Sequence, residues 1–194
     1  MAQQKGIIKL KGKIGDISFY KTQDGHLARE KGGVDASRIA NDPAFVRTRE
    51  NGAEFGSSAS SGKVLRDALR TMLMTASDNR VTSRLTKLMT DIKNLDATSA
   101  RGLRTVGTAI ALPTAKALLK GFNFNSKAIL GGVLYKAYAV NTVTGVITIN
   151  GLVPINDIAF PAGATHMNIK GAWAKIDFAT GVYDVQFSNV VNLA

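Results

Sequence analysis

The chain changes both its hydrophobic pattern and its charge near Asn125. Before this point apolar residues recur at helical spacing over long stretches, and after it they alternate in short runs between glycine-containing turns. Residues 1–126 hold 21 of the 25 Lys and Arg and 11 of the 14 Asp and Glu. They therefore carry a charge of +10, against +1 for residues 127–194. We predict an α+β protein with two domains, residues 1–125 and residues 126–194.

The N-terminal segment is predicted to form a β-meander. Residues 8–14 alternate apolar and basic side chains, which is the pattern of a half-buried strand. Turn signals at Gly15-Asp16 and Asp24-Gly25 separate this strand from two further runs. The three expected strands are residues 8–14, 17–22 and 27–30.

A central helical segment is expected to follow the meander. Asp42-Pro43 is a helix start signal, because Asp accepts free backbone N–H groups and Pro is tolerated in the first turn. Residues 51–62 contain three glycines, and their sequence leaves helix and hinge as open alternatives. The remaining predicted helices cover residues 63–76, a segment starting at Ser77-Asp78, and residues 114–120. In the second of these, the apolar side consists of Val81, Leu85, Leu88, Met89 and Ile92.

Two hairpins are predicted in the C-terminal part. A two-residue turn at Thr180-Gly181 would place Ile176 opposite Val185 and Asp177 opposite Asp184. A turn at Thr144-Gly145 would form a similar ribbon. Each ribbon has one apolar face, which we expect to be buried in an antiparallel β-sandwich-like module or against the helices.

Basic side chains form the candidate site, either as phosphate ligands or as a protein interface. Lysines two residues apart on a strand match the spacing of phosphates along nucleic acid, but they also protect an edge strand from aggregation. Arginines four residues apart share a helix face, which suits phosphates, solvent or an acidic partner surface. The candidates are Lys9, Lys11, Lys13, Arg47, Arg49, Arg66, Arg70, Arg80, Arg84 and Lys87.

The residues that usually carry catalysis or bind metals are sparse. The chain has no cysteine, and its two histidines, His26 and His166, have no Ser, Asp or second His at a spacing typical of a triad or a metal site. The facing pair Asp177 and Asp184 supplies too few ligands for a calcium cage. Glycine pairs occur without the Lys and Ser or Thr of a phosphate loop. We therefore expect no enzymatic activity, no cofactor and no metal site.

No targeting or membrane segment is expected. Lysines interrupt the only apolar stretch at the N-terminus, which argues against a secretory signal. The most apolar long run, residues 106–119, contains Pro113 and Lys116 and is shorter than the roughly 20 residues that span a bilayer. We predict no membrane insertion, and a cytoplasmic location or a place in a particle assembled in the cytoplasm.

Parts of the sequence resemble a group of small basic proteins from Bacteroidota. The resembling stretches are Lys9–Gly12, Ile14-Gly15, Ser18–Thr22, Ala28–Val34, Arg38–Phe45, Arg47–Gly52 and Glu54–Gly56, with fainter likeness at Gly121–Phe124 and Phe160–His166. The resemblance implies a bacterial or phage origin. It carries over no catalytic or binding residues.

These observations predict a non-enzymatic structural protein that self-assembles as a homo-oligomer or joins a larger particle. If the chain has a phage origin, we expect that particle to be a virion. The alternative is a protein that binds nucleic acid without sequence specificity through its basic N-terminal segment. The net positive charge is therefore a property of residues 1–126 and not of the whole chain.

Overall fold

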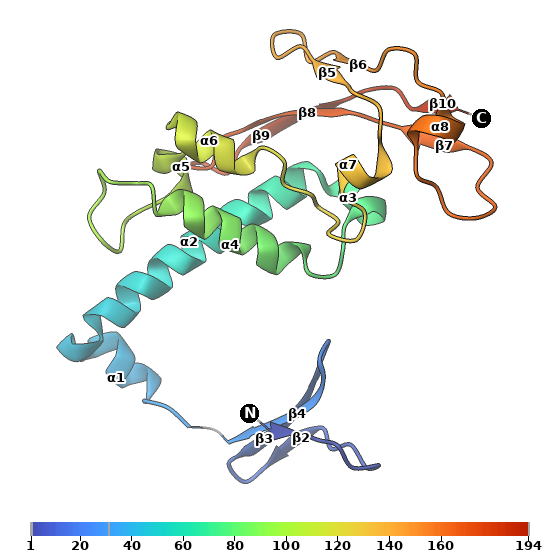
Figure 1. The fold of residues 1–194 in the computed structure, drawn as a ribbon. Coiled ribbons are helices and arrows are strands. Elements are labelled where there is room, and N and C mark those ends of the chain that lie inside the picture. The colour runs from blue at the N-terminus through green and yellow to red at the C-terminus, as the bar shows by residue number, and fades with distance from the viewer. Residues whose placement is uncertain (1, 31, 194) are drawn as a thin grey trace. The chain divides into compact units, whose positions relative to one another are not determined.

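The computed structural model describes residues 2–30 and 32–193 (Figure 1). It contains helices and antiparallel strands, with a strand sheet first, helices in the middle and further strands at the end, so the predicted α+β class is confirmed. The chain forms two compact units, Met1–Thr48 and Arg49–Ala194. The change in composition near residue 125 therefore lies inside the second unit.

The first unit contains a four-stranded antiparallel sheet with the order β1-β4-β3-β2. Its strands are β1 Ala2–Gln3, β2 Gly12–Ile14, β3 Ile17–Thr22 and β4 Gly25–Glu30. The predicted meander corresponds to β2, β3 and β4, whereas β1 was not expected.

The prediction of a strand over residues 8–14 is wrong for residues 8–11. The Gln4 side chain accepts a hydrogen bond from the Leu10 N–H at 2.9 Å and donates one to the Leu27 carbonyl at 3.0 Å, which holds this segment in a loop. The apolar positions are also not half-buried, since Ile8 is 79% exposed and Ile14 61% exposed.

A long helix connects the two units. After the short helix α1 (Ala36–Asn41) and a 3₁₀ turn at Pro43–Phe45, α2 runs without interruption from Val46 to Ala68. The start signal is confirmed, because the Asp42 carboxylate accepts the Ala44 N–H at 2.9 Å. Residues 51–62 are thus helix and not hinge.

The second unit is built around a helical core (Figure 1). Its further helices are α3 Arg70–Ala76, α4 Val81–Lys93, α5 Val106–Ala109, α6 Pro113–Leu119, α7 Leu130–Val133 and α8 Pro154–Asp157. The expected apolar side of α4 is confirmed, with Leu85, Met89 and Ile92 fully buried against Val106 and Ala115. The prediction of one helix over residues 63–76 is wrong, because Leu69 leaves helical geometry between α2 and α3 (φ −101°, ψ 16°).

The C-terminal strands pair as three antiparallel two-stranded sheets, β5–β6, β8–β9 and β7–β10. They are β5 Ala139–Val140, β6 Ile147–Thr148, β7 Met167–Ile169, β8 Ala172–Ile176, β9 Tyr183–Phe187 and β10 Val191–Leu193. Among the described residues these ribbons do not join into the larger sheets that a sandwich stacks.

Both expected hairpins are present, but their predicted register is wrong by two residues. Ile176 lies opposite Tyr183, and Lys175 lies opposite Asp184, so the two aspartates do not face each other. The cause is a four-residue loop in place of a two-residue turn. In β8–β9 the Asp177 N–H bonds to the Val182 carbonyl at 2.9 Å and thereby closes the loop. In β5–β6, Asn141 and Val146 are joined in the same way, also at 2.9 Å.

The expected burial of one face on each ribbon is also not observed. Within residues 127–193, Ile158 is the single buried residue that the structure describes. Side chains on the apolar face of β8–β9 stay open, with Tyr183 44% and Phe187 39% exposed. Two-stranded ribbons have too little area to cover both of their own faces.

Candidate functional site

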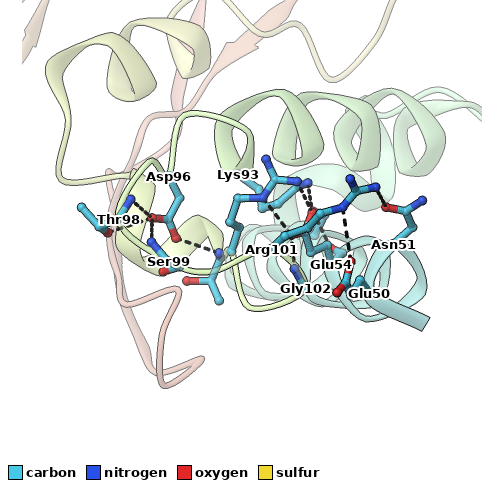
Figure 2. Close-up of polar contacts among 12 residues, drawn as sticks. Glu50, Asn51, Glu54, Lys93, Asp96, Thr98, Ser99, Arg101 and Gly102 are labelled. Atoms are coloured by element: carbon cyan, nitrogen blue, oxygen red, sulfur yellow. Dashed lines mark hydrogen bonds and ion pairs between the residues drawn. The ribbon is translucent and has the colours of Figure 1, made fainter. Parts of the chain in front are cut away.

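The most ordered polar group in the second unit is a buried carboxylate, Glu54, on α2. Its Oε1 accepts the Gly102 N–H at 2.7 Å and Arg104 Nε at 2.8 Å. Its Oε2 accepts Arg104 Nη2 at 2.8 Å and Lys93 Nζ at 2.5 Å. Figure 2 shows these groups converging from α2, from the end of α4 and from the loop that follows α4. Each oxygen of the buried Glu54 carboxylate therefore accepts two hydrogen bonds.

A second buried carboxylate, Asp96, organises the same loop from its other side. It accepts the N–H groups of Thr98, Ser99 and Thr105 at 3.1, 3.0 and 3.2 Å. Its Oδ1 also accepts the Thr98 hydroxyl at 2.9 Å. Residues 96–105 are thus held from within by Asp96 and against α2 by Glu54 (Figure 2).

Gly102 brings the loop backbone close to α2. It has φ +90°, and a Cβ at this position would lie 2.8 Å from Cγ of Glu50. Only glycine combines this backbone conformation with such a close approach. Arg101 beside it forms an ion pair with Glu50 at 3.3 Å and a hydrogen bond to Asn51 at 3.3 Å.

Hydrogen bonds favour the ionised forms of Glu54 and Asp96. Hydrogen bonds from Arg104, together with Lys93 and the Gly102 N–H, outweigh burial and lower the pKa of Glu54 to about 2. The same bond raises the pKa of the Arg104 side chain. For Asp96, burial by itself would raise the pKa, but hydrogen bonds from Ser99, Thr105 and Thr98 prevail and lower it. A carboxylate that stays ionised and is saturated with donors fits a structural clamp better than a general acid or base.

The sequence prediction did not bring the members of this cluster together. Glu54 lies in a segment rich in Gly and Ser, and Lys93 closes a helix whose apolar side ends at Ile92. One signal was present in the sequence: Ser58 and Gly62 follow Glu54 at spacings of four and eight residues, which share one side of a helix. In the structure all three are buried in α2. A stripe of small residues with an acid in line indicates a close helix contact that includes a buried charge.

The three candidate lysines of the N-terminal segment are exposed but do not form one row. Lys9 and Lys11 lie in the loop before β2, where Lys9 Nζ donates to the Gln4 carbonyl. Lys13 lies in β2, opposite Ser18 of β3, which is itself opposite Arg29 of β4. The structure therefore joins Lys13 with Arg29, a residue that sequence reasoning did not select.

The helical candidates are also distributed differently from the prediction. Arg66 lies in α2 and Arg70 begins α3, so the two arginines do not belong to one helix. Arg80 precedes α4 as its N-cap residue, and Arg84 and Lys87 lie within α4. Arg47 and Arg49 lie in the first turns of α2.

The Arg84 side chain holds other parts of the chain together. It donates to the carbonyl of Asn123 at 2.8 Å and to Asp78 Oδ2 at 2.6 Å, and it lies 5.2 Å from the Phe122 ring centroid. Asp78 in turn accepts the Ser126 N–H at 2.7 Å. Hydrogen bonds from Ser126, with Arg84 adding to them, lower the pKa of Asp78. These contacts hold residues 122–126 on α4. Lys87 makes a more ordinary surface pair with Asp91 at 2.8 Å.

The two histidines lie apart in the sequence and in different settings. His26 is partly buried in β4 opposite Lys21, and its Nδ1 is enclosed without a hydrogen-bond partner. His166 is exposed and its Nδ1 is 2.9 Å from the Thr165 hydroxyl. Neither contact supplies the carboxylate of a catalytic triad.

Over residues 2–30 and 32–193, no three His, Cys, Asp or Glu side chains lie together in a way that could hold a metal ion. Within the same ranges, none of the helices has both the length and the apolar character needed to cross a membrane. No protein-family model, no curated protein and no solved structure matches this chain.

Proposed function

We propose that this chain is a non-enzymatic structural protein that self-associates, by itself or as part of a larger particle such as a virion assembled in the cytoplasm. The observation that carries the proposal is the open apolar surface of the C-terminal ribbons. Large apolar side chains with at least two-fifths of their surface exposed lie on and beside these ribbons: Tyr138, Val140, Val143, Val146, Ile147, Trp173, Val182, Tyr183, Val190 and Val191. Exposed apolar side chains in such number on one part of a chain are typical of interaction sites.

The ribbons also offer backbone groups to a partner. Neither β8 nor β9 has a second neighbouring strand among the described residues. A two-stranded ribbon alone is marginally stable in water, and a further strand that pairs with its edge supplies both hydrogen bonds and apolar cover. Association through the ribbons would therefore supply the cover that the chain does not provide by itself.

The distribution of charge favours a second copy as the partner. Residues 127–194 carry a net charge of +1, so two copies that meet through this part experience little repulsion. Residues 1–126 carry +10, and contact between two copies through that part would bring like charges together. The near-neutral, apolar end of the chain is the surface suited to self-association.

Light scattering coupled to size-exclusion chromatography tests this proposal. We expect the wild-type protein to elute as a species larger than one chain, with a mass that rises with concentration. The variant Tyr183→Lys with Phe187→Lys adds two charges to the apolar face of β8–β9, and we expect it to be monomeric. Electron microscopy of the wild-type protein then shows the form of the assembly.

The matched control is Met74→Lys with Leu103→Lys. These apolar side chains are 76% and 71% exposed and lie outside the ribbons, so the variant adds the same charge elsewhere. It should assemble like the wild-type protein. A wild-type protein that stays monomeric at high concentration contradicts the proposal, as does equal loss of assembly in both variants.

A further inference from the structure

One face of the N-terminal sheet brings two cations and a hydroxyl together. Lys13, Ser18 and Arg29 are directly opposite one another on β2, β3 and β4, so their side chains share one face of the sheet. Adjacent strands lie about 4.8 Å apart, so β2 and β4, on either side of β3, are about 10 Å apart. Two long basic side chains can reach one small anion across this separation. Together with Glu30 and Gly32, these residues line an open hollow of about 300 Å³.

The two cations are available to a ligand. Within the part of the chain that the structure describes, neither the Lys13 ammonium nor the Arg29 guanidinium has a hydrogen bond or an ion pair with a protein group. The Arg29 guanidinium lies over the Tyr20 ring, 5.6 Å from its centroid. This cation–π contact limits the rotamers of Arg29 and leaves the edge of its planar fork free for hydrogen bonds.

We propose that this row, Lys13–Ser18–Arg29, binds a phosphate group of single-stranded nucleic acid. An ammonium, a hydroxyl and a guanidinium are the donors that proteins use for phosphate oxygens. The surrounding unit supports an anionic ligand, because residues 1–48 hold nine Lys and Arg against five Asp and Glu. One phosphate contact on a small sheet suits a flexible single strand, whereas a duplex-binding protein makes about six to ten such contacts.

The site works through charge and not through base identity. Glu30 is the acid on the rim of the hollow, and it opposes binding of an anion. A phosphate in the hollow contacts Lys13 and Arg29 irrespective of the base attached to it. Binding should therefore weaken with salt and should vary little between oligonucleotide sequences.

Fluorescence anisotropy with a labelled 20-nucleotide oligothymidine, measured from 20 to 200 mM NaCl, tests the site. We expect binding by the wild-type protein and about tenfold or greater weakening in Lys13→Gln with Arg29→Gln. The slope of log K against log salt should decrease by about 0.7, the value for one phosphate contact to a single strand. Glu30→Gln should bind more tightly than the wild-type protein.

The control variant is Lys120→Gln with Lys127→Gln, which removes two exposed charges from the second unit. It should retain nearly all of the affinity and most of the salt slope. Circular dichroism checks that each variant keeps its fold. If the control loses as much affinity as the site variant, or if the wild-type protein does not bind at 20 mM NaCl, the proposal is wrong.

Two further probes separate the possible sources of phosphate. Inorganic phosphate at millimolar concentration should compete weakly, because it occupies one contact without the rest of the strand. Vesicles containing phosphatidylserine should bind less tightly than the oligonucleotide. If vesicles bind more tightly and lose this affinity in Lys13→Gln with Arg29→Gln, the ligand is a lipid headgroup and the assignment to nucleic acid fails.

Discussion

The two ribbons β5–β6 and β8–β9 end in the same loop but dock differently. The loops are Asn141–Val146, with the sequence NTVTGV, and Asp177–Val182, with the sequence DFATGV. In both, the first side chain accepts the N–H groups of the third and fourth residues. In both, the glycine N–H donates to the first carbonyl at 2.8 Å, and the glycine φ angles are +74° and +75°.

The residues at the second and third positions make the difference. In the second loop, Phe178 packs against the helical core and Ala179 lies against Gly107 of α5. In the first loop these positions hold Thr142 and Val143, and Val143 is 90% exposed. The Asx residue and the glycine therefore set the loop conformation, while the two residues after Asx decide where the ribbon docks.

Removing the ionic support of the helices should have the largest effect on this comparison. Glu54→Ala leaves Lys93 buried without its partner, so we expect the free energy of unfolding to fall by about 3–5 kcal/mol in urea denaturation. Because the second loop docks on these helices, amide exchange at Gly181 should approach the rate at Gly145. Asp67→Ala removes a surface ion pair with Lys63 and should cost well under 1 kcal/mol. Equal losses in the two variants would show that the Glu54 cluster is no more important than a surface pair.

Truncating the docking side chain should have the next largest effect. Phe178 is partly buried, so Phe178→Ala should lower the free energy of unfolding by about 2–3 kcal/mol. Thr142→Ala changes the equivalent position of the first loop and should leave stability nearly unchanged. Thermal and urea denaturation of both variants measure the difference. A similar loss for both would mean that the two loops are equally docked.

Crowding the helix surface beneath the second loop should also separate the ribbons. In Gly107→Ala the new Cβ would lie 3.0 Å from the Cα of Ala179, so the loop must shift, at a cost of about 1–3 kcal/mol. The control is Gly131→Ala in α7, where the Cβ has open space. We expect Gly131→Ala to be neutral or slightly stabilising. Amide exchange at Gly181 should increase in the first variant only, and an unchanged rate would contradict the docking contact.

The smallest effect should come from the charge that distinguishes the two loops. Hydrogen bonds from Thr180 and Ala179 lower the pKa of Asp177 below its ordinary value of 3.8. Ionised Asp177 thus stabilises the fold above that pH, and this contribution is lost as the pH falls through the lowered pKa. The unfolding midpoint of Asp177→Asn should therefore change less than that of the wild-type protein between pH 5 and pH 3, about one unit to either side of the ordinary pKa. Asn141→Asp should become more sensitive, and no change in either variant would contradict the role of the carboxylate.

The fold class could be predicted because it depends on hydrophobic patterns within single helices and strands. The apolar side of α4 and the position of α6, predicted at residues 114–120, were readable because both are properties of one element. The register of the hairpins was not predicted, because Thr-Gly was interpreted as a complete turn. The signal for a longer loop was the Asx residue four positions before each glycine, whose side chain caps the intervening N–H groups.

The candidate sites were harder to predict because they depend on contacts between distant segments. Residues 8–11 alternate like a strand, yet a strand needs a partner, and Gln4 occupies the Leu10 N–H. Glu54 finds its partners 39 to 50 residues later in the sequence, at Lys93 and Arg104. Arg29 became a candidate only when the sheet placed it in line with Lys13. Local periodicity contains no information about such pairs.

The contacts of Glu54 and Arg84 also imply an order of events during synthesis. The ionic cluster is complete at Arg104, and the contacts of Arg84 and Asp78 are complete at Ser126. The helical body can therefore form before residues 139–187 have emerged from the ribosome. The ribbons that we propose as the self-association surface emerge later, when the helical body can already be folded. Neighbouring nascent chains on one messenger RNA would thus be kept from associating until their helices are in place.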